Sequence, residues 1–168
     1  MGRQDNVYIC AKRKGVSVII RRESLASIKT DIQPLLELEW SEAPLEDWPI
    51  KYEPDWGKYG LLDAHNMLLA YTLRDGHELV GYVIFVKDYA HHHHGYKVAR
   101  LDLFFIHPDY RKGRTAMDLL AFAQEHMDEI GVDMTIVSCF MQSRVDVLYK
   151  RMGYKPLERT FVRFKDGS

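Results

Sequence analysis

The run Phe105-Ile-His-Pro-Asp-Tyr-Arg-Lys-Gly-Arg-Thr-Ala-Met117 joins a buried strand to a long helix through a short basic loop. The strand, Val98–His107, is largely apolar, as is typical of a strand in the centre of a sheet. Pro108 ends it. Apolar residues then recur every three or four positions as far as Gly131, which predicts an amphipathic helix that ends at this glycine.

The basic loop has the composition of an anion-binding site. Backbone N–H groups in the first turn of a helix have no partner within the helix, and the helix dipole adds a partial positive charge. A glycine lets the backbone approach a phosphate closely. On spacing alone, a surface turn with solvated basic side chains explains the loop as well. The residues expected around the anion are Arg111, Lys112, Gly113, Arg114, Thr115 and Ala116.

Antiparallel strands are predicted ahead of this junction. Val16–Arg21 is rich in β-branched residues, and Met67–Arg74 and Glu78–Tyr89 flank a glycine-containing turn, which predicts a hairpin. The chain therefore combines antiparallel strands with a strand–helix–strand run, and the fold class is a mixed α/β (α+β) fold.

The remaining elements complete this picture. A helix is expected to begin at Thr30 or Asp31, with Pro34 in its first turn. The elements expected after the junction are a strand at Met134–Phe140, a short helix from Ser143 to Gly153 and a last strand at Leu157–Lys165.

Composition excludes several classes of protein. The chain has 168 residues, the size of one domain, so we expect a single domain over residues 1–168. It has 23 Lys and Arg against 24 Asp and Glu, which argues against a dedicated nucleic-acid binder. It has no apolar run long enough to span a membrane and begins without an apolar signal region. Its two cysteines, Cys10 and Cys139, cannot form a disulfide framework, so a reduced cytoplasm is the expected location.

Over residues 16–165 the sequence resembles the GNAT superfamily of N-acetyltransferases. The acetyl-CoA motif of that superfamily, Arg/Gln-x-x-Gly-x-Gly/Ala after a strand and a Pro turn, is matched by His107–Ala116, with Arg111 in the first position. Arg114 stands at the usual central glycine, and the glycine lies one residue earlier at Gly113.

A second GNAT signature, Tyr-x-x-x-Gly-Phe/Tyr, stands at Tyr149–Tyr154, and Leu79–Tyr82 resembles the hairpin strand of the superfamily. The histidine-rich loop and the run Tyr110–Thr115 look most like a branch that is common in tailed phages and prophages. The resemblance implies a GNAT fold, in which a mixed central β-sheet is flanked by helices in three layers. It also implies acetyl-CoA as the cosubstrate.

Roles for single residues follow from the same resemblance. Backbone groups of Phe104, Phe105 and Ile106 would lie along the pantetheine arm and supply a donor to the reacting carbonyl. Tyr149 would protonate the departing thiolate, and Asp102 stands where many relatives carry the base. From the residues alone, a core tyrosine and an aspartate paired with an arginine explain these two positions as well.

Four consecutive histidines, His91–His94, follow the predicted hairpin. Consecutive side chains of an extended loop point to alternate sides, so a single metal ion cannot easily bind all four, and no metal site is expected. The favoured interpretation is a substrate-side loop in which His94 acts as a base and His92 contacts the substrate.

Carboxylates and aromatic rings alternate between Glu37 and Tyr59. Clustered carboxylates concentrate cations, and aromatic faces attract ammonium groups. With Glu42 and Asp55 as contacts, this segment favours a positively charged acceptor: a polyamine, a basic peptide or lysine side chain, or an amino sugar. A solvated face above buried tryptophans is nearly as good an interpretation.

Two functions therefore stand side by side. The first is an acetyl-CoA-dependent N-acetyltransferase, which transfers an acetyl group to a primary amine of a small molecule or protein by direct attack. The second is a catalytically inactive GNAT-shaped protein, for example a phage protein that binds a host factor in the host cytoplasm. The displaced Gly113 favours the second function, and Tyr149 speaks against it. Because GNAT proteins often dimerise, the resemblance also allows for a homodimer.

Overall fold

The computed structural model describes residues 7–13, 16–43, 45, 48–49, 51–141 and 143–165. In these residues six strands form one sheet in the order β1-β2-β3-β4-β5-β6. Neighbouring strands are antiparallel except β5 and β6, which are parallel. The strands are β1 (Val7–Arg13), β2 (Val16–Glu23), β3 (Leu68–Asp75), β4 (Glu78–Tyr89), β5 (Lys97–Ile106) and β6 (Met134–Ile136).

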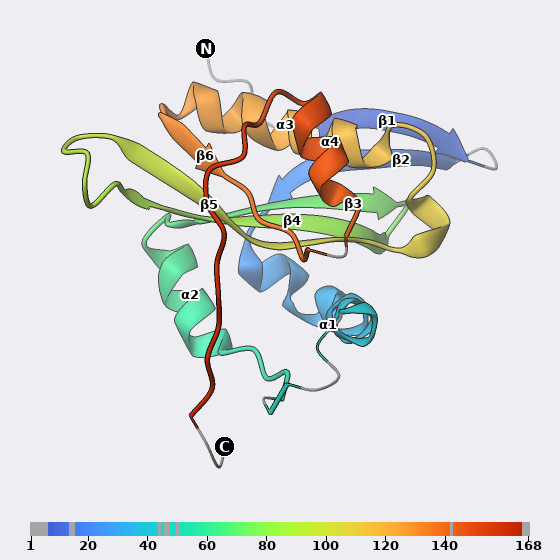
Figure 1. Ribbon diagram of the computed structural model, residues 1–168. Helices are drawn as coiled ribbons and strands as arrows, with labels where there is room; N and C mark the ends of the chain where they lie inside the picture. The colour runs from blue at the N-terminus through green and yellow to red at the C-terminus, as the bar shows by residue number, and fades with distance from the viewer. Residues whose placement is uncertain are drawn as a thin grey trace.

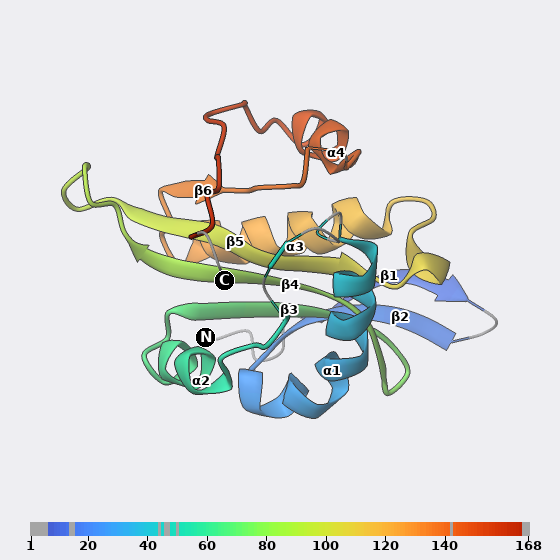
Figure 2. The same cartoon turned by 60° about the horizontal axis from the view of Figure 1, so that its bottom comes forward.

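Helices cover both faces of this sheet (Figures 1 and 2). Two of them, α1 and α2, lie on one face, and α3 and α4 lie on the other. The helices are α1 (Leu25–Glu42), α2 (Trp56–Ala64), α3 (Thr115–Glu129) and α4 (Val145–Arg151), with a 3-10 turn at Pro108–Tyr110. The mixed three-layer fold that the sequence predicts is thus confirmed.

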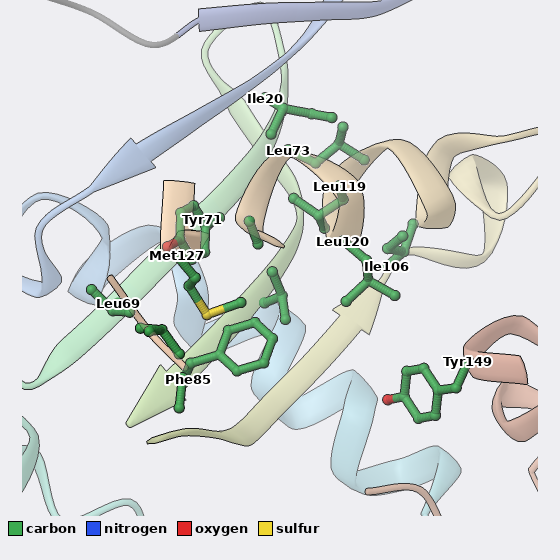
Figure 3. Close-up of a cluster of buried hydrophobic side chains, with 14 of the residues drawn as sticks. Ile20, Leu69, Tyr71, Leu73, Phe85, Ile106, Leu119, Leu120, Met127 and Tyr149 are labelled. Carbon is green, nitrogen blue, oxygen red and sulfur yellow. The ribbon is translucent and has the colours of Figure 1, made fainter. Parts of the chain in front are cut away.

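The side chains of the central strands divide the core in two, because successive residues of a strand point to opposite faces. On β3, Leu69, Tyr71 and Leu73 pack in the cluster that contains α3, whereas Leu68 and Ala70 pack in the cluster that contains α1. Figure 3 shows the first of these clusters. Both faces of the strand are covered, which explains why its sequence is a continuous apolar run rather than an alternating one.

The first helix begins earlier than predicted. Ser24, rather than Thr30 or Asp31, caps α1, and its side chain accepts a hydrogen bond from the backbone amide of Ser27. Pro34 therefore lies inside the helix and not in its first turn. Thr30 and Pro34 are both exposed, so water can bond the Thr30 carbonyl that has no helical donor.

The end of the chain also differs from the prediction. β6 ends at Ile136 rather than Phe140, and residues 157–165 do not form the expected last strand. This segment runs past β6 and crosses towards the α2 side of the sheet (Figures 1 and 2). Phe164 packs edge-on against Trp48, with ring centroids 5.1 Å apart. A strand needs a neighbour to complete its backbone hydrogen bonds, and residues 157–165 are not paired with any of the six strands of the described sheet.

Candidate functional site

The junction between β5 and α3 has the geometry that its sequence predicts. A 3-10 turn follows the strand, and α3 begins at Thr115 without a side-chain cap on its first N–H groups. Gly113 has φ +74°, in the left-handed region that favours glycine. The Thr115 hydroxyl donates to the carbonyl of Lys112 at 3.1 Å, which keeps the loop compact. The arrangement suits an anion at the helix N-terminus.

Arg111 lies beside this loop and joins β5 to the end of α1. Its Nε donates to the carbonyl of Ile106 and its Nη2 donates to Glu42, both at 2.7 Å. Its guanidinium also lies 4.9 Å from the centre of the Phe105 ring. Glu42, predicted as a substrate contact, is therefore held by an arginine that was predicted to bind the cofactor.

A bulge distinguishes the middle of β5. Ile84 of β4 pairs with Leu103, but Phe85 pairs with Leu101, so Asp102 is the extra residue of a β-bulge. Pairing of β5 with β6 covers only three positions and ends at Arg100. Along the rest of β5, which includes the predicted cofactor contacts Phe104, Phe105 and Ile106, the edge away from β4 is not paired with β6.

Tyr149 projects from α4 into the α3-side core cluster (Figure 3). It is 6% exposed, and its hydroxyl donates to the carbonyl of Ser138 at 3.1 Å. Burial raises the pKa of the Tyr149 phenol above its usual value, and the nearby Cys139 and Tyr154 raise it further. The side chain is thus a neutral phenol that keeps its proton at physiological pH.

Asp102 contacts a tyrosine rather than an arginine. The hydroxyl of Tyr59, on α2, donates to its carboxylate at 2.5 Å, and the Asp102 side chain is exposed. Close by, Tyr82 of β4 donates to the carboxylate of Glu39, and Tyr52 stacks on Trp40 with ring centroids 4.9 Å apart. We call Glu39, Tyr52, Tyr59, Tyr82 and Asp102 the acceptor-side cluster.

Three members of the acceptor-side cluster are not among the site residues predicted from the sequence: Glu39, Tyr59 and Tyr82. For Glu39 a signal exists, because the apolar stripe of α1 runs through Ile32 and Leu36 and the next position of that stripe is a glutamate. An acid at a core-facing position of a helix requires a partner. The role of Tyr59 has no such signal, since α2 itself is not predicted.

The histidine loop does not join this cluster. His91–His94 are exposed at the tip of the β4–β5 hairpin, which extends away from the sheet centre (Figure 1). The start of β5 alone is roughly 17 Å of strand away from Asp102, at about 3.3 Å per residue. The structure thus places the predicted base His94 and the predicted contact His92 apart from the carboxylates. The third predicted contact, Asp55, caps α2 by accepting from the amide of Lys58 at 2.9 Å.

No group of three or more His, Cys, Asp or Glu side chains in the described residues is arranged to hold a metal ion. No helix among them has both the length and the apolar character needed to cross a membrane.

Comparison with known proteins identifies relatives of this fold. Residues 32–154 match the family model described as acetyltransferase (GNAT) family. The ribosomal-protein-alanine N-acetyltransferase of Brucella melitensis biovar Abortus 2308 matches with a TM-score of 0.66 at 20% identity, over 88% of this chain and 99% of that one. No curated protein sequence matches significantly.

Two aminoglycoside acetyltransferases have the same fold. One, from an uncultured soil metagenomic sample and in complex with sisomicin, matches with a TM-score of 0.65 at 13% identity, over 88% of this chain and 94% of that one. The other, AAC(6')-Iy in complex with CoA, matches with a TM-score of 0.62 at 14% identity, over 87% of this chain and 98% of that one.

Proposed function

Because the chain belongs to the GNAT acetyltransferase family, we propose that it transfers an acetyl group from acetyl-CoA to a primary amine by direct attack on the thioester. The observation that carries this proposal is the junction of β5 and α3. There the first turn of α3 has no side-chain cap and Gly113 has a positive φ. Free amides and the helix dipole at that point suit the two linked phosphates of CoA.

The same junction supplies the groups that would hold the cosubstrate. The loop from Lys112 to Ala116 would bind the pyrophosphate, and Arg111 would add its charge from beside the loop. The edge of β5 that is not paired with β6, at Phe104–Ile106, would bond the amide groups of the pantetheine arm as a neighbouring strand does. A backbone N–H there would donate to the carbonyl oxygen as it gains negative charge.

Tyr149 and Asp102 would act on either side of the thioester. Tyr149, a buried neutral phenol, would give a proton to the departing thiolate. Asp102, which is exposed on β5, would bind the amine or take its proton. No cysteine nucleophile is needed for direct transfer.

The acceptor-side cluster favours a cationic amine. It contains two carboxylates and three phenols, and within the described residues neither Glu39 nor Asp102 makes an ion pair. An ammonium group would supply the missing charge. We propose a polyamine, a lysine side chain or an amino sugar as acceptor.

Calorimetric titration with acetyl-CoA tests the cosubstrate directly. We expect binding heat and an increase in melting temperature. Turnover is then measured as free thiol released with spermidine, sisomicin, a lysine-containing peptide and a peptide with an N-terminal alanine. The absence of both heat and thermal protection would leave the inactive binding protein as the better account.

The role of Tyr149 has its own test. Tyr149→Phe removes the proton donor but keeps the ring, so we expect kcat to fall by about 100-fold with little change in the KM for acetyl-CoA. Tyr154→Phe is the matched control, because Tyr154 is a tyrosine near the same helix whose hydroxyl donates to Gln124 instead. Equal kcat values for the two variants would exclude the role.

A further inference from the structure

Glu39 of α1 lies in an environment that suits a reactive carboxylate. It lies on the sheet-facing stripe of α1 and is half-buried, and the buried hydroxyl of Tyr82 donates to it. Arg111, which reaches the end of the same helix, bonds Glu42 and the carbonyl of Ile106. Glu39 is therefore a half-buried acid held by a neutral donor, which the packing of the helix alone does not explain.

The groups that face Glu39 are acids or phenols. Burial raises the pKa of the Glu39 carboxyl. Hydrogen bonds from Tyr82 and from the backbone amide of Phe104 oppose this effect, and the charges of Asp102 and Glu42 add to it, so the pKa ends above its usual value. The titratable and charged groups that face it from the surrounding elements are Glu42 (α1), Tyr52 (the α1–α2 connection), Tyr59 (α2), Tyr82 (β4) and Asp102 (β5).

The two carboxylates of the cluster differ in position. Glu39 lies close enough to the backbone amide of Phe104 for that amide to lower its pKa. Phe104 belongs to the part of β5 where the thioester would lie under the proposed function. Asp102 precedes Phe104 by two residues, is exposed, and is bonded by Tyr59 from α2. Glu39 is thus adjacent to the proposed reacting carbonyl, and Asp102 is at the solvent side.

We propose that Glu39 is the general base of this reaction, and that Asp102 with Tyr59 binds and orients the ammonium group of the acceptor. This assignment rests on the proposed acetyl transfer. The ammonium gives one proton to the Glu39 carboxylate, and the freed nitrogen lone pair forms a C–N bond to the thioester carbonyl carbon. As the C–S bond breaks, the thiolate takes a proton from Tyr149 and the nitrogen loses its second proton to restore that phenol. Glu39 finally returns its proton to water.

The test compares Glu39→Gln with Glu37→Gln, an exposed glutamate on the same helix that receives a hydrogen bond from Gln33. Thiol release is measured from pH 5 to pH 9 with whichever of spermidine, sisomicin and the two peptides the wild type acetylates. For Glu39→Gln we expect kcat to fall about 100-fold, a nearly unchanged KM for the amine, and no acid-side decline in kcat. Glu37→Gln should match the wild type.

Two further variants separate the roles. Asp102→Asn should raise the KM for the amine about tenfold and keep most of kcat, because it weakens binding rather than proton transfer. Tyr82→Phe removes a bond that lowers the pKa of Glu39, so the acid-side decline in kcat should move to higher pH. If Glu39→Gln does not fold, the pH profile of Tyr82→Phe still tests the role of Glu39.

A failure of the role of Glu39 can be distinguished from a failure of the proposed acetyl transfer. If acetyl-CoA binds and turnover proceeds but Glu39→Gln keeps its kcat and its acid limb, the role of Glu39 is wrong while acetyl transfer stands. Interchanged kinetic effects of the Glu39 and Asp102 variants would overturn the assignment in the same way. If acetyl-CoA gives no heat, or none of the four amines is acetylated, the proposed function and the role of Glu39 both fail.

Discussion

At the scale of single residues, the hydrogen-bonded pair of Tyr71 and His126 joins β3 to α3. Tyr71 is fully buried, and its hydroxyl lies 2.8 Å from Nδ1 of His126, where the nitrogen of a neutral imidazole can accept a hydrogen bond from the hydroxyl. Burial lowers the pKa of His126, the charge of Arg22 lowers it further, and Glu129 partly opposes these effects. The pair therefore favours neutral histidine.

Stability should depend on this histidine. A histidine whose pKa is lowered in the folded state contributes stability that is complete above its unfolded pKa, about 6.5, and is lost as the pH falls towards the folded pKa. We expect the melting temperature to decline between pH 7.5 and pH 5, and this decline to be smaller in His126→Gln. Circular dichroism melts give both curves. His65→Gln, at an exposed position, is the control, and parallel curves for all three proteins would contradict the argument.

At the scale of elements, the C-terminus of α3 shows how one glycine ends a helix. Gly131 has φ +74°, its amide donates to the carbonyl of Asp128, and the amide of Val132 donates to the carbonyl of Met127. This is a Schellman motif, in which the residue after the helix takes the left-handed conformation. The prediction that the helix ends at Gly131 is confirmed.

Replacing glycine with alanine should change the free energy of unfolding in opposite directions at Gly131 and at Gly60. Gly131→Ala forces a side chain into the left-handed region and should lower the free energy of unfolding by about 1 kcal/mol. Gly60→Ala lies inside α2, where an added methyl meets nothing within 4 Å, and should raise it by about 0.5–1 kcal/mol. Urea unfolding measures both. A stabilising Gly131→Ala would disprove the account of the helix end.

At the scale of the whole molecule, the sheet has a core on each face. Leu36 of α1 and Leu120 of α3 are both 1% exposed, and they pack in different clusters on opposite sides of the same strands. Because the central strands contribute side chains to both clusters, neither core can form without the sheet. The single domain over residues 1–168 stays a prediction. The phage-like branch, the cytoplasmic location and a homodimer stay predictions.

The shared sheet predicts one unfolding transition. Leu36→Ala and Leu120→Ala should each lower the free energy of unfolding by about 3 kcal/mol and leave a single cooperative transition. Leu61→Ala, at a residue that is 65% exposed, should change it by less than about 0.5 kcal/mol. Calorimetry and urea unfolding give these values. Two separate transitions in either core variant would show that the faces unfold independently.

Sequence patterns predict the elements whose signals are local. The β3–β4 hairpin, β5, the helix that ends at Gly131 and the short helix α4 are all confirmed, because periodicity and turn residues act between neighbours in the chain. The prediction of a last strand at Leu157–Lys165 is wrong for a non-local reason. The weak alternation of this segment fits a strand, but pairing requires a neighbour, which only the path of the folded chain can supply.

The candidate site also has a part that sequence patterns predict and a part that they do not. The basic loop before α3 could be located from residues 105–117 alone, because a strand, a glycine and a helix start are adjacent in the chain. The acceptor-side cluster could not, since Tyr59 meets Asp102 and Tyr82 meets Glu39 across 43 residues in each case. Those contacts exist only because α1 and α2 pack on the same face of the sheet. Composition showed that acids and aromatic rings gather in this region, and tertiary packing selected which carboxylate each phenol bonds.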